Sequence, residues 1–123
     1  MNRTLQLNPM NKVATWDDIK AKRDSLETSP ITITEGVFDA DRDALLRIDS
    51  ALSAFDVLPT LDVNNKLGWK TFDNQVVLLD KTQLQYLREE IAKRAALLHF
   101  NAGVIVSGSH LVKDLDNTEL WGI

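Results

Sequence analysis

The chain has 123 residues, of which 44% are hydrophobic and 26% charged, and its formal net charge is −4. This composition is that of a folded protein rather than a disordered one, and the length fits one domain. The acidic balance argues against nucleic acid as a partner, because nucleic acid requires a basic surface. Cysteine is absent, which excludes disulfides and thiolate metal sites.

Two kinds of hydrophobic segment are missing from the sequence. No apolar run approaches the roughly 20 residues that a membrane-spanning helix needs, so we expect no membrane partner. Residues 1–13 contain no continuous apolar stretch, and we expect no signal peptide there. We interpret residues 1–14 as an N-terminal arm that packs on this domain or on another chain.

The first half of the chain predicts a helix, a short hairpin and a second helix. Residues 15–18 have the form of a capping box, and Ser29-Pro30 ends the helix that follows. Residues 31–34 alternate β-branched side chains, and Glu35-Gly36 is a turn signal before a short second strand. Asp39 is the expected N-cap of the next helix. The apolar seam of that helix comprises Leu45, Ile48, Leu52 and Phe55.

The second half predicts a β-hairpin that runs directly into a helix, after a loop over residues 56–66. The arms of the hairpin are residues 67–72 and 75–79. Asp73-Asn74 between them predicts a two-residue type I′ turn, because both residues tolerate positive φ. Residues 80–83 form a second capping box, with Thr82 as a competing cap. The buried side of this helix is marked by Leu84, Leu87, Ile91, Ala95 and Leu98.

The sequence leaves the end of the last helix open. An apolar stripe continues through Ala102, Ile105, Ser109 and Val112, which favours one long helix. Against this, Gly103 and Gly108 each cost about 1 kcal/mol inside a helix. Residues 104–106 also have the composition of a strand, so a strand or loop is the alternative. Residues 116–123 are too apolar for a solvated tail, and we expect them to dock.

These patterns together predict an α+β fold. It consists of a small antiparallel β-hairpin sheet packed with three amphipathic helices, of which the last is long. The predicted domain covers residues 15–115, between the arm at 1–14 and a C-terminal tail at 116–123.

One cluster of carboxylates suggests a metal site. Asp39, Asp41 and Asp43 copy the first three ligand positions of a calcium loop. The match then fails, because Ala44 replaces the glycine and Ser50 replaces the bidentate glutamate. We therefore interpret the cluster as the acidic start of a helix and expect no metal.

The residues that catalysis most often uses are also poorly arranged. His99 and His110 lie about three helical turns apart, too far to share a metal ion. Ser107-Gly-Ser109 lacks the pattern of a nucleophile elbow, and the scattered glycines form no phosphate-binding loop. We expect no catalytic residues, no cofactor and no enzymatic activity.

We expect partners to bind near the two ends of the chain. Trp16, Trp69 and Trp121 are interpreted mainly as core anchors, but Trp121 is the one expected in an intermolecular contact. A last helix that reached Val112 would also permit a self-associating bundle, and hence a homo-oligomer. The predicted partner-binding residues are Leu5, Leu7, Leu111, Leu115, Trp121 and Ile123.

The order of several motifs resembles a known family. It begins with Trp16-Asp-Asp-Ile19-Lys-Ala-Lys-Arg23-Asp24, followed by a strand with Gly36 and by Phe38-Asp39-Ala-Asp41 at a helix start. Trp69-Lys-Thr71-x-Asp73-Asn74 and Leu79-x-x-x-Gln83-Leu84 come next, before a helix rich in Ala and Arg with His99 beyond. This order is similar to an uncharacterised domain family found in bacteriophage tail and tail-fibre proteins. The chain departs from that pattern after Gly103.

The resemblance implies a structural or adaptor protein of a bacteriophage tail, baseplate or tail fibre. Such a virion component is made in the cytoplasm of the bacterial host and acts through protein–protein contacts with other phage tail proteins. The alternative is an assembly chaperone that binds tail-fibre protein and is not retained in the virion. The family carries no assigned catalytic residues, so none are transferred to this chain.

Overall fold

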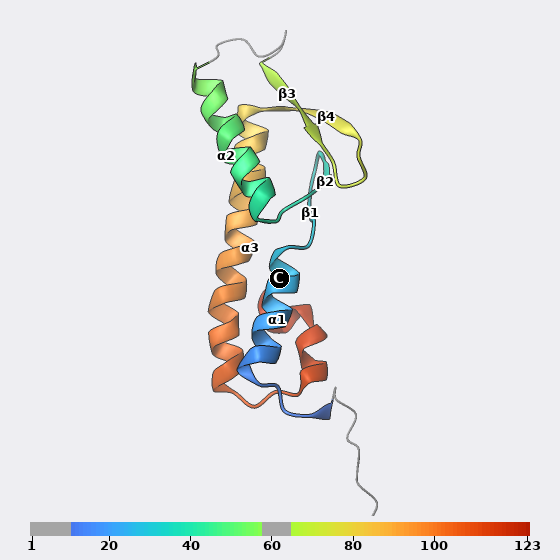
Figure 1. Cartoon of the computed structure of the whole chain (residues 1–123), viewed down its shortest axis with the longest axis vertical. Coiled ribbons are helices and arrows are strands. Elements are labelled where there is room, and N and C mark those ends of the chain that lie inside the picture. The colour runs from blue at the N-terminus through green and yellow to red at the C-terminus, as the bar shows by residue number, and fades with distance from the viewer. Residues whose placement is uncertain (1–10, 58–64) are drawn as a thin grey trace, which may run out of the picture. The chain divides into compact units, whose positions relative to one another are not determined.

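The computed structural model describes residues 11–57 and 65–123. It has the predicted α+β fold, with three helices, the last of them long, and two antiparallel two-stranded hairpins. The described residues form two compact units, one made of residues 11–26 and 96–123 and the other of residues 27–95. The elements in chain order are α1 (Trp16–Glu27), β1 (Ile31–Ile33), β2 (Gly36–Phe38), α2 (Arg42–Val57), β3 (Lys66–Lys70), β4 (Val76–Asp80), α3 (Lys81–Ser107) and the 3-10 helices η2 (Val112–Asp116) and η3 (Thr118–Trp121) (Figure 1).

α1 begins with the predicted capping box. The Thr15 N–H donates to Asp18 Oδ2 at 2.9 Å, and the Asp18 N–H donates to Thr15 Oγ1 at 3.3 Å. These bonds satisfy backbone donors that a helix start leaves without intrahelical partners. The backbone N–H and the hydroxyl of Thr15 both stabilise the carboxylate, and they lower the pKa of Asp18.

Ile19 and Trp16 on α1 differ in burial. Ile19 is fully buried, whereas Trp16 is 45% exposed, so the interpretation of Trp16 as a core anchor is wrong. The Arg23 guanidinium lies over the Trp16 ring, 5.7 Å from its centroid, in a cation–π arrangement at the surface.

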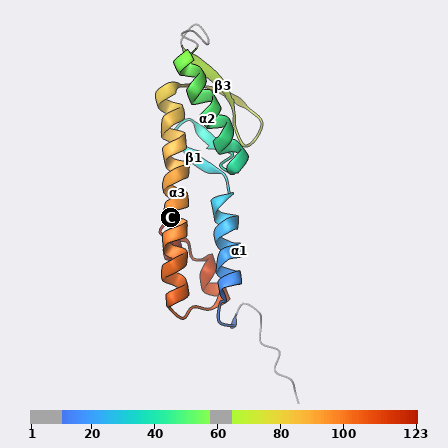
Figure 2. The ribbon, with the colours of Figure 1, turned by 60° about the vertical axis from the view of Figure 1, so that its left-hand side comes forward.

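The unit of residues 11–26 and 96–123 is closed by the C-terminal segment. In Figure 2, α1, the last turns of α3 and the C-terminal segment lie side by side. An antiparallel bridge joins Val13 to Leu111, and the Lys22 ammonium pairs with Asp116 at 2.8 Å. The expected docking of the tail is therefore confirmed. The buried core comprises Ile19, Leu98, Ala102, Ile105, Leu115 and Trp121.

The long last helix is confirmed, but its expected extension to Val112 is wrong. α3 includes residues 104–106 and ends at Ser107. The Gly108 N–H bonds to the Ile105 carbonyl at 3.2 Å, and a Cβ at Gly108 would lie 3.0 Å from His110 Nε2. After Ser107 the chain turns back, and this turn ends the helix. The Val112 N–H then donates to the Lys12 carbonyl at 2.9 Å.

In the unit of residues 27–95, α2 begins two residues later than predicted. The Ala44 N–H donates to Asp41 Oδ1 at 2.8 Å, so Asp41 rather than Asp39 is the N-cap. The reason is that β2 continues to Phe38, whose side chain is fully buried, and Asp39 stays in the connection. The predicted seam is confirmed, with Ile48 fully buried and its neighbours packed around it.

The turn between β3 and β4 is longer than the predicted type I′ turn. The strands pair from Lys66↔Asp80 to Lys70↔Val76, and of the two expected turn residues only Asn74 has a positive φ, 65°. The Asn74 N–H bonds to the Thr71 carbonyl at 3.1 Å, and the Gln75 N–H bonds to Thr71 Oγ1 at 3.0 Å. This is the form of a three-residue loop that ends in a left-handed residue. The Thr71 hydroxyl supplies the acceptor that lets the loop close.

α3 starts with the second predicted capping box. The Asp80 N–H donates to Gln83 Oε1 at 2.9 Å, and the Gln83 N–H returns a bond to Asp80 Oδ1 at 2.8 Å, so Thr82 is not the cap. The expected loop over residues 56–66 is wrong at both ends, since Asp56 belongs to α2 and Lys66 to β3, while residues 58–64 lie outside the described residues. The core of this unit comprises Ile33, Phe38, Ala40, Ile48, Leu79, Leu84, Leu87 and Ile91.

Candidate functional site

A pocket of about 410 Å³ lies between the start of α2 and the edge of β3. We call it the β3 pocket. Ala44 is buried and Trp69 half-buried, so these two form its apolar part, while Arg47 and Lys70 are exposed at its opening. Its described lining residues are Asp39, Ala44, Arg47, Gly68, Trp69 and Lys70.

The strand that lines this pocket has an unpaired outer edge. The Thr71 N–H bonds to the Gln75 carbonyl, so the backbone N–H of Thr71 faces the partner strand, and such positions alternate along an antiparallel ladder. Gly68 and Lys70 lie opposite Leu78 and Val76. These positions alternate with the ones whose backbone groups bond to β4. Their backbone N–H and C=O groups therefore point away from β4. Within the part of the chain that the structure describes, no further strand pairs with β3.

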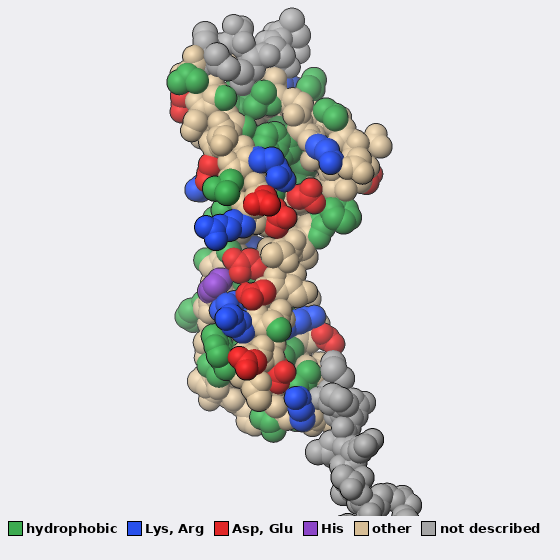
Figure 3. Space-filling view, viewed as in Figure 1, with side chains coloured by type: hydrophobic (Ala, Val, Ile, Leu, Met, Phe, Trp, Pro, Cys, Tyr) green, Lys and Arg blue, Asp and Glu red, His purple; other side chains and the backbone are tan. Residues whose placement is uncertain are grey.

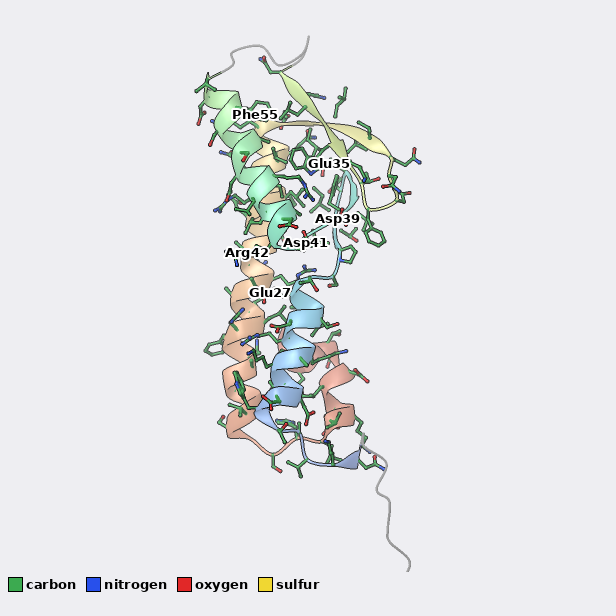
Figure 4. All side chains as sticks on the ribbon, in the orientation of Figure 1. Glu27, Glu35, Asp39, Asp41, Arg42 and Phe55 are labelled. Atoms are coloured by element: carbon green, nitrogen blue, oxygen red, sulfur yellow. The ribbon has the colours of Figure 1, made fainter. Side chains whose placement is uncertain are left out.

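Arg47 and Lys70 make the β3 pocket locally positive in a chain whose formal net charge is −4. Among residues 11–57 and 65–123, neither cation lies within 4.0 Å of a carboxylate. Asp39 adds one carboxylate to the lining, from the connection between β2 and α2 (Figure 4). Two unpaired cations beside one anion favour a ligand that carries negative charge.

Hydrophobic side chains are exposed on the β3–β4 hairpin, on its turn and on β2. We call Val37, Phe72, Val76 and Leu78 the hairpin patch. Val76 is 69% exposed, because alternate residues of β4 face away from the core that buries Leu79. The Phe72 N–H donates to the Val37 carbonyl at 2.8 Å, which ties the turn to β2. Figure 3 shows hydrophobic side chains at the surface of this unit, among charged ones.

A further apolar surface lies on α3. Phe100 is 70% exposed and Val104, one turn later on the same face, is 51% exposed. A Cβ at Gly103 would meet nothing within 4 Å, so this part of the helix surface is open. Here only side chains are available to a partner, because the backbone groups are bonded within the helix.

Arg94 has a structural role. Its Nη2 donates to the carbonyls of Glu27 and Ser29 at 2.8 and 2.7 Å, and its Nη1 donates to the Pro30 carbonyl at 3.2 Å. These carbonyls lie at and after the C-terminus of α1, where helix acceptors lack intrahelical partners. Burial lowers the pKa of Arg94, and the carboxylate of Glu27 opposes that shift. Both terminal nitrogens are engaged by the protein itself, whereas the buried Nε has no hydrogen-bond partner among the described residues. The contacts of the terminal nitrogens hold the backbone after α1 in place.

The structure corrects two of the predicted partner-binding residues. The Trp121 side chain is 0% exposed, and its Nε1 donates to the Leu115 carbonyl at 2.9 Å. Leu115 is itself buried, so both residues belong to the core of this chain and present no surface to a partner. The sequence predicted that the tail docks and that Trp121 makes an intermolecular contact, but the 3-10 turns fold Leu115 and Trp121 into the core of their own chain.

The other predicted partner-binding residues are placed differently. Leu111 is half-buried in the bridge to Val13, and Ile123 is 42% exposed. Leu5 and Leu7 lie outside the described residues. Nothing in the sequence pattern indicated a binding role for Arg47, and Lys70 occurred only within the Trp69-Lys-Thr71 motif. The available signal was Gly68, because a glycine inside a strand often marks a close backbone approach.

The described residues contain no group of three histidine, aspartate or glutamate side chains that could hold a metal. Of the suspected calcium cluster, Asp41 is engaged as the cap of α2, and Figure 4 shows it at the helix start. No helix among the described residues is long and apolar enough to cross a membrane.

Comparison with known proteins gives one match. No curated protein and no solved structure matches the chain. A family model described as "Domain of unknown function (DUF4376)" matches residues 10–107, which include every helix and strand from α1 to α3. The chain therefore belongs to the DUF4376 family.

Proposed function

We propose that the chain is a structural or adaptor protein of a bacteriophage tail and that it acts through protein–protein contacts. The observation that carries the contact role is the β3–β4 hairpin. It combines a strand edge without a described partner, a pocket with two cations that pair with no carboxylate of the described residues, and the apolar hairpin patch. Exposed strand edges and clustered exposed apolar residues are features of sites that bind other proteins. The tail assignment is supported by the ordered motifs from Trp16 to Gln83 that resemble phage tail proteins.

A contact role also fits the distribution of polar groups over the rest of the described chain. Asp41, Asp80 and Asp18 cap the starts of helices, and Arg94 binds backbone carbonyls. Side chains so engaged hold the fold in place. In the β3 pocket, by contrast, Arg47 and Lys70 make no ion pair with a described carboxylate.

Quantitative mass spectrometry of purified virions tests the proposal. The virions come from the phage that encodes the chain, and copies per particle are measured against the major tail protein. We expect a constant ratio across preparations, with host cytoplasmic proteins as the contamination control. A protein that is absent from particles but bound to tail-fibre protein in infected cells would be an assembly chaperone. Absence from both would overturn the proposal.

Self-association is a second contact that the proposal includes. The exposed Phe100 and Val104 offer an apolar helix surface to a second copy. Light scattering of the isolated protein over a range of concentrations should show an oligomer, and Phe100→Glu should return it to the monomer. A wild-type protein that stays monomeric at high concentration would exclude this contact, while leaving the role of the hairpin open to its own test.

A further inference from the structure

We propose that β3 binds an extended acidic segment of a partner protein, which adds a third strand to the hairpin at the β3 pocket. This inference rests on the proposed contact function and names the kind of partner. It follows from three observations: the direction of backbone groups in β3, the charge of the pocket and the unfavourable pairing of β3 with a second copy of itself.

The backbone of β3 supplies the first part of the recognition. Gly68 and Lys70 direct their N–H and C=O groups away from β4, which leaves alternate donors and acceptors for an added strand. Gly68 has no side chain, and a Cβ there would lie 3.1 Å from Val76 Cγ1. A glycine inside a strand often marks a place where another backbone approaches closely.

Charged side chains supply the second part. Side chains of an added strand alternate between its two faces. Lys70 projects on the same face as Gly68, whereas Arg47 comes from α2, which packs on the core-facing side of the hairpin. A carboxylate on either face of the added strand therefore meets a cation. Arginine in particular can bind a carboxylate through two parallel hydrogen bonds.

A second copy of β3 fits the same edge poorly. The antiparallel register that uses the whole strand pairs Gly68 with its own counterpart, and it places Lys66 opposite Lys70 of the other copy at both ends. Like charges directly opposite each other destabilise a strand pair. Lysines on an edge strand are also a common protection against self-pairing. An acidic strand reverses this effect, because the same lysines then attract it.

Three synthetic peptides test the proposal with the intact protein. The probe is a capped octapeptide of alternating valine and glutamate. One control replaces glutamate by lysine, and the other keeps glutamate but carries N-methyl groups on alternate residues, which removes the donors needed for strand pairing. Binding is measured by calorimetry and by amide shifts in 15N-labelled protein. We expect micromolar affinity for the probe, shifts at the Gly68 and Lys70 amides, and at least tenfold weaker binding of both controls.

Charge-reversal variants locate the binding. Arg47→Glu and Lys70→Glu should each weaken binding of the valine–glutamate peptide at least fivefold. Lys93→Glu, an exposed position on α3 outside the pocket, should leave it unchanged. Thermal unfolding of all three variants checks that the fold persists.

Several results would overturn the inference. The first is that saturating peptide leaves the Gly68 and Lys70 amide shifts unchanged. The second is that the N-methylated or the lysine peptide binds as tightly as the probe. The third is that a folded Arg47→Glu Lys70→Glu double variant binds the probe with unchanged affinity. The virion measurement is independent of this one. A protein found in virions that fails the peptide test retains the proposed function and loses the strand-addition site. The opposite result is also possible: the protein binds the peptide but is absent from virions and does not bind tail-fibre protein in infected cells. In that case the strand-addition site stands and the tail assignment is wrong.

Discussion

The two compact units use exposed and buried apolar residues in different ways. In the unit of residues 11–26 and 96–123, the C-terminal segment folds back and buries Trp121 completely. What this unit leaves exposed on α3, such as Phe100, lies on a helix whose backbone groups are already bonded. In the unit of residues 27–95, the β3–β4 hairpin exposes apolar side chains and a strand edge together.

This difference separates residues that stabilise the fold from residues that are available to a partner. An apolar residue near a chain end looks like a contact residue in the sequence, yet Trp121 is a core residue. The pattern of a strand indicates only a structural role, yet Gly68 and Lys70 on the outer edge of β3 direct their backbone groups away from β4. The unit of residues 27–95 is therefore the better candidate for strand addition.

The largest effect on stability is expected for Trp121→Ala, in the unit of residues 11–26 and 96–123. Removing a fully buried indole should lower the free energy of unfolding by about 3–5 kcal/mol, because a cavity remains in the core. Urea unfolding followed by circular dichroism measures this. Ile123→Ala, at a 42% exposed position two residues away, is the control and should cost far less. Equal, small effects for both variants would show that the tail is not part of the core.

A smaller effect on stability is expected for Arg94→Ala, in the unit of residues 27–95. The carbonyls of Glu27, Ser29 and Pro30 lose their donors, which should cost about 1–3 kcal/mol of stability. Arg94→Lys should recover only part of this, since an ammonium lacks the planar fork that reaches several acceptors. Chemical denaturation measures all three proteins. Full recovery by lysine would indicate that charge alone matters there.

The turn of the hairpin should respond more modestly. Asn74 has a φ of 65°, so Asn74→Ala should destabilise the hairpin by about 1 kcal/mol, because alanine pays a steric penalty in the left-handed region. Asn74→Gly removes that penalty and should be neutral or slightly stabilising. Hydrogen exchange at the Thr71 amide, bonded to Gln75, reports local opening of the hairpin. A glycine variant that opens more readily than the alanine variant would contradict the assigned turn.

The smallest effect concerns the pH dependence of the α1 cap. The folded-state pKa of Asp18 is lowered below its ordinary 3.8 by the Thr15 bonds. The carboxylate therefore contributes stability above pH 3.8, and this contribution is lost as the pH falls through the lowered value. Wild type should be slightly more stable than Asp18→Ala at neutral pH, and the difference should shrink below pH 3.8 in thermal unfolding. A difference that grows on acidification would contradict the cap.

Prediction from the sequence succeeded where the contacts are local. Both capping boxes, Thr15 with Asp18 and Asp80 with Gln83, formed as expected because their partners lie three residues apart. The cap of α2 was misplaced because the choice between Asp39 and Asp41 depends on where β2 ends. The β3 pocket was not predicted at all, since Arg47 and Lys70 come from separate elements that the folded core brings together.

The amino-acid sequence by itself determined the fold class, the starts of α1 and α3 and the long last helix, because these depend on periodicity and on bonds within a single turn. The tertiary structure decided which residues are buried and which edge is open. Trp121 is held in the core by the Asn101 side chain, whose amide donates to the Trp121 carbonyl at 3.0 Å across 20 residues of sequence. α3 ends where residues 11–14 bridge to the segment after it. Such contacts between distant residues leave no local pattern, and here they separate the core from the surface that a partner can reach.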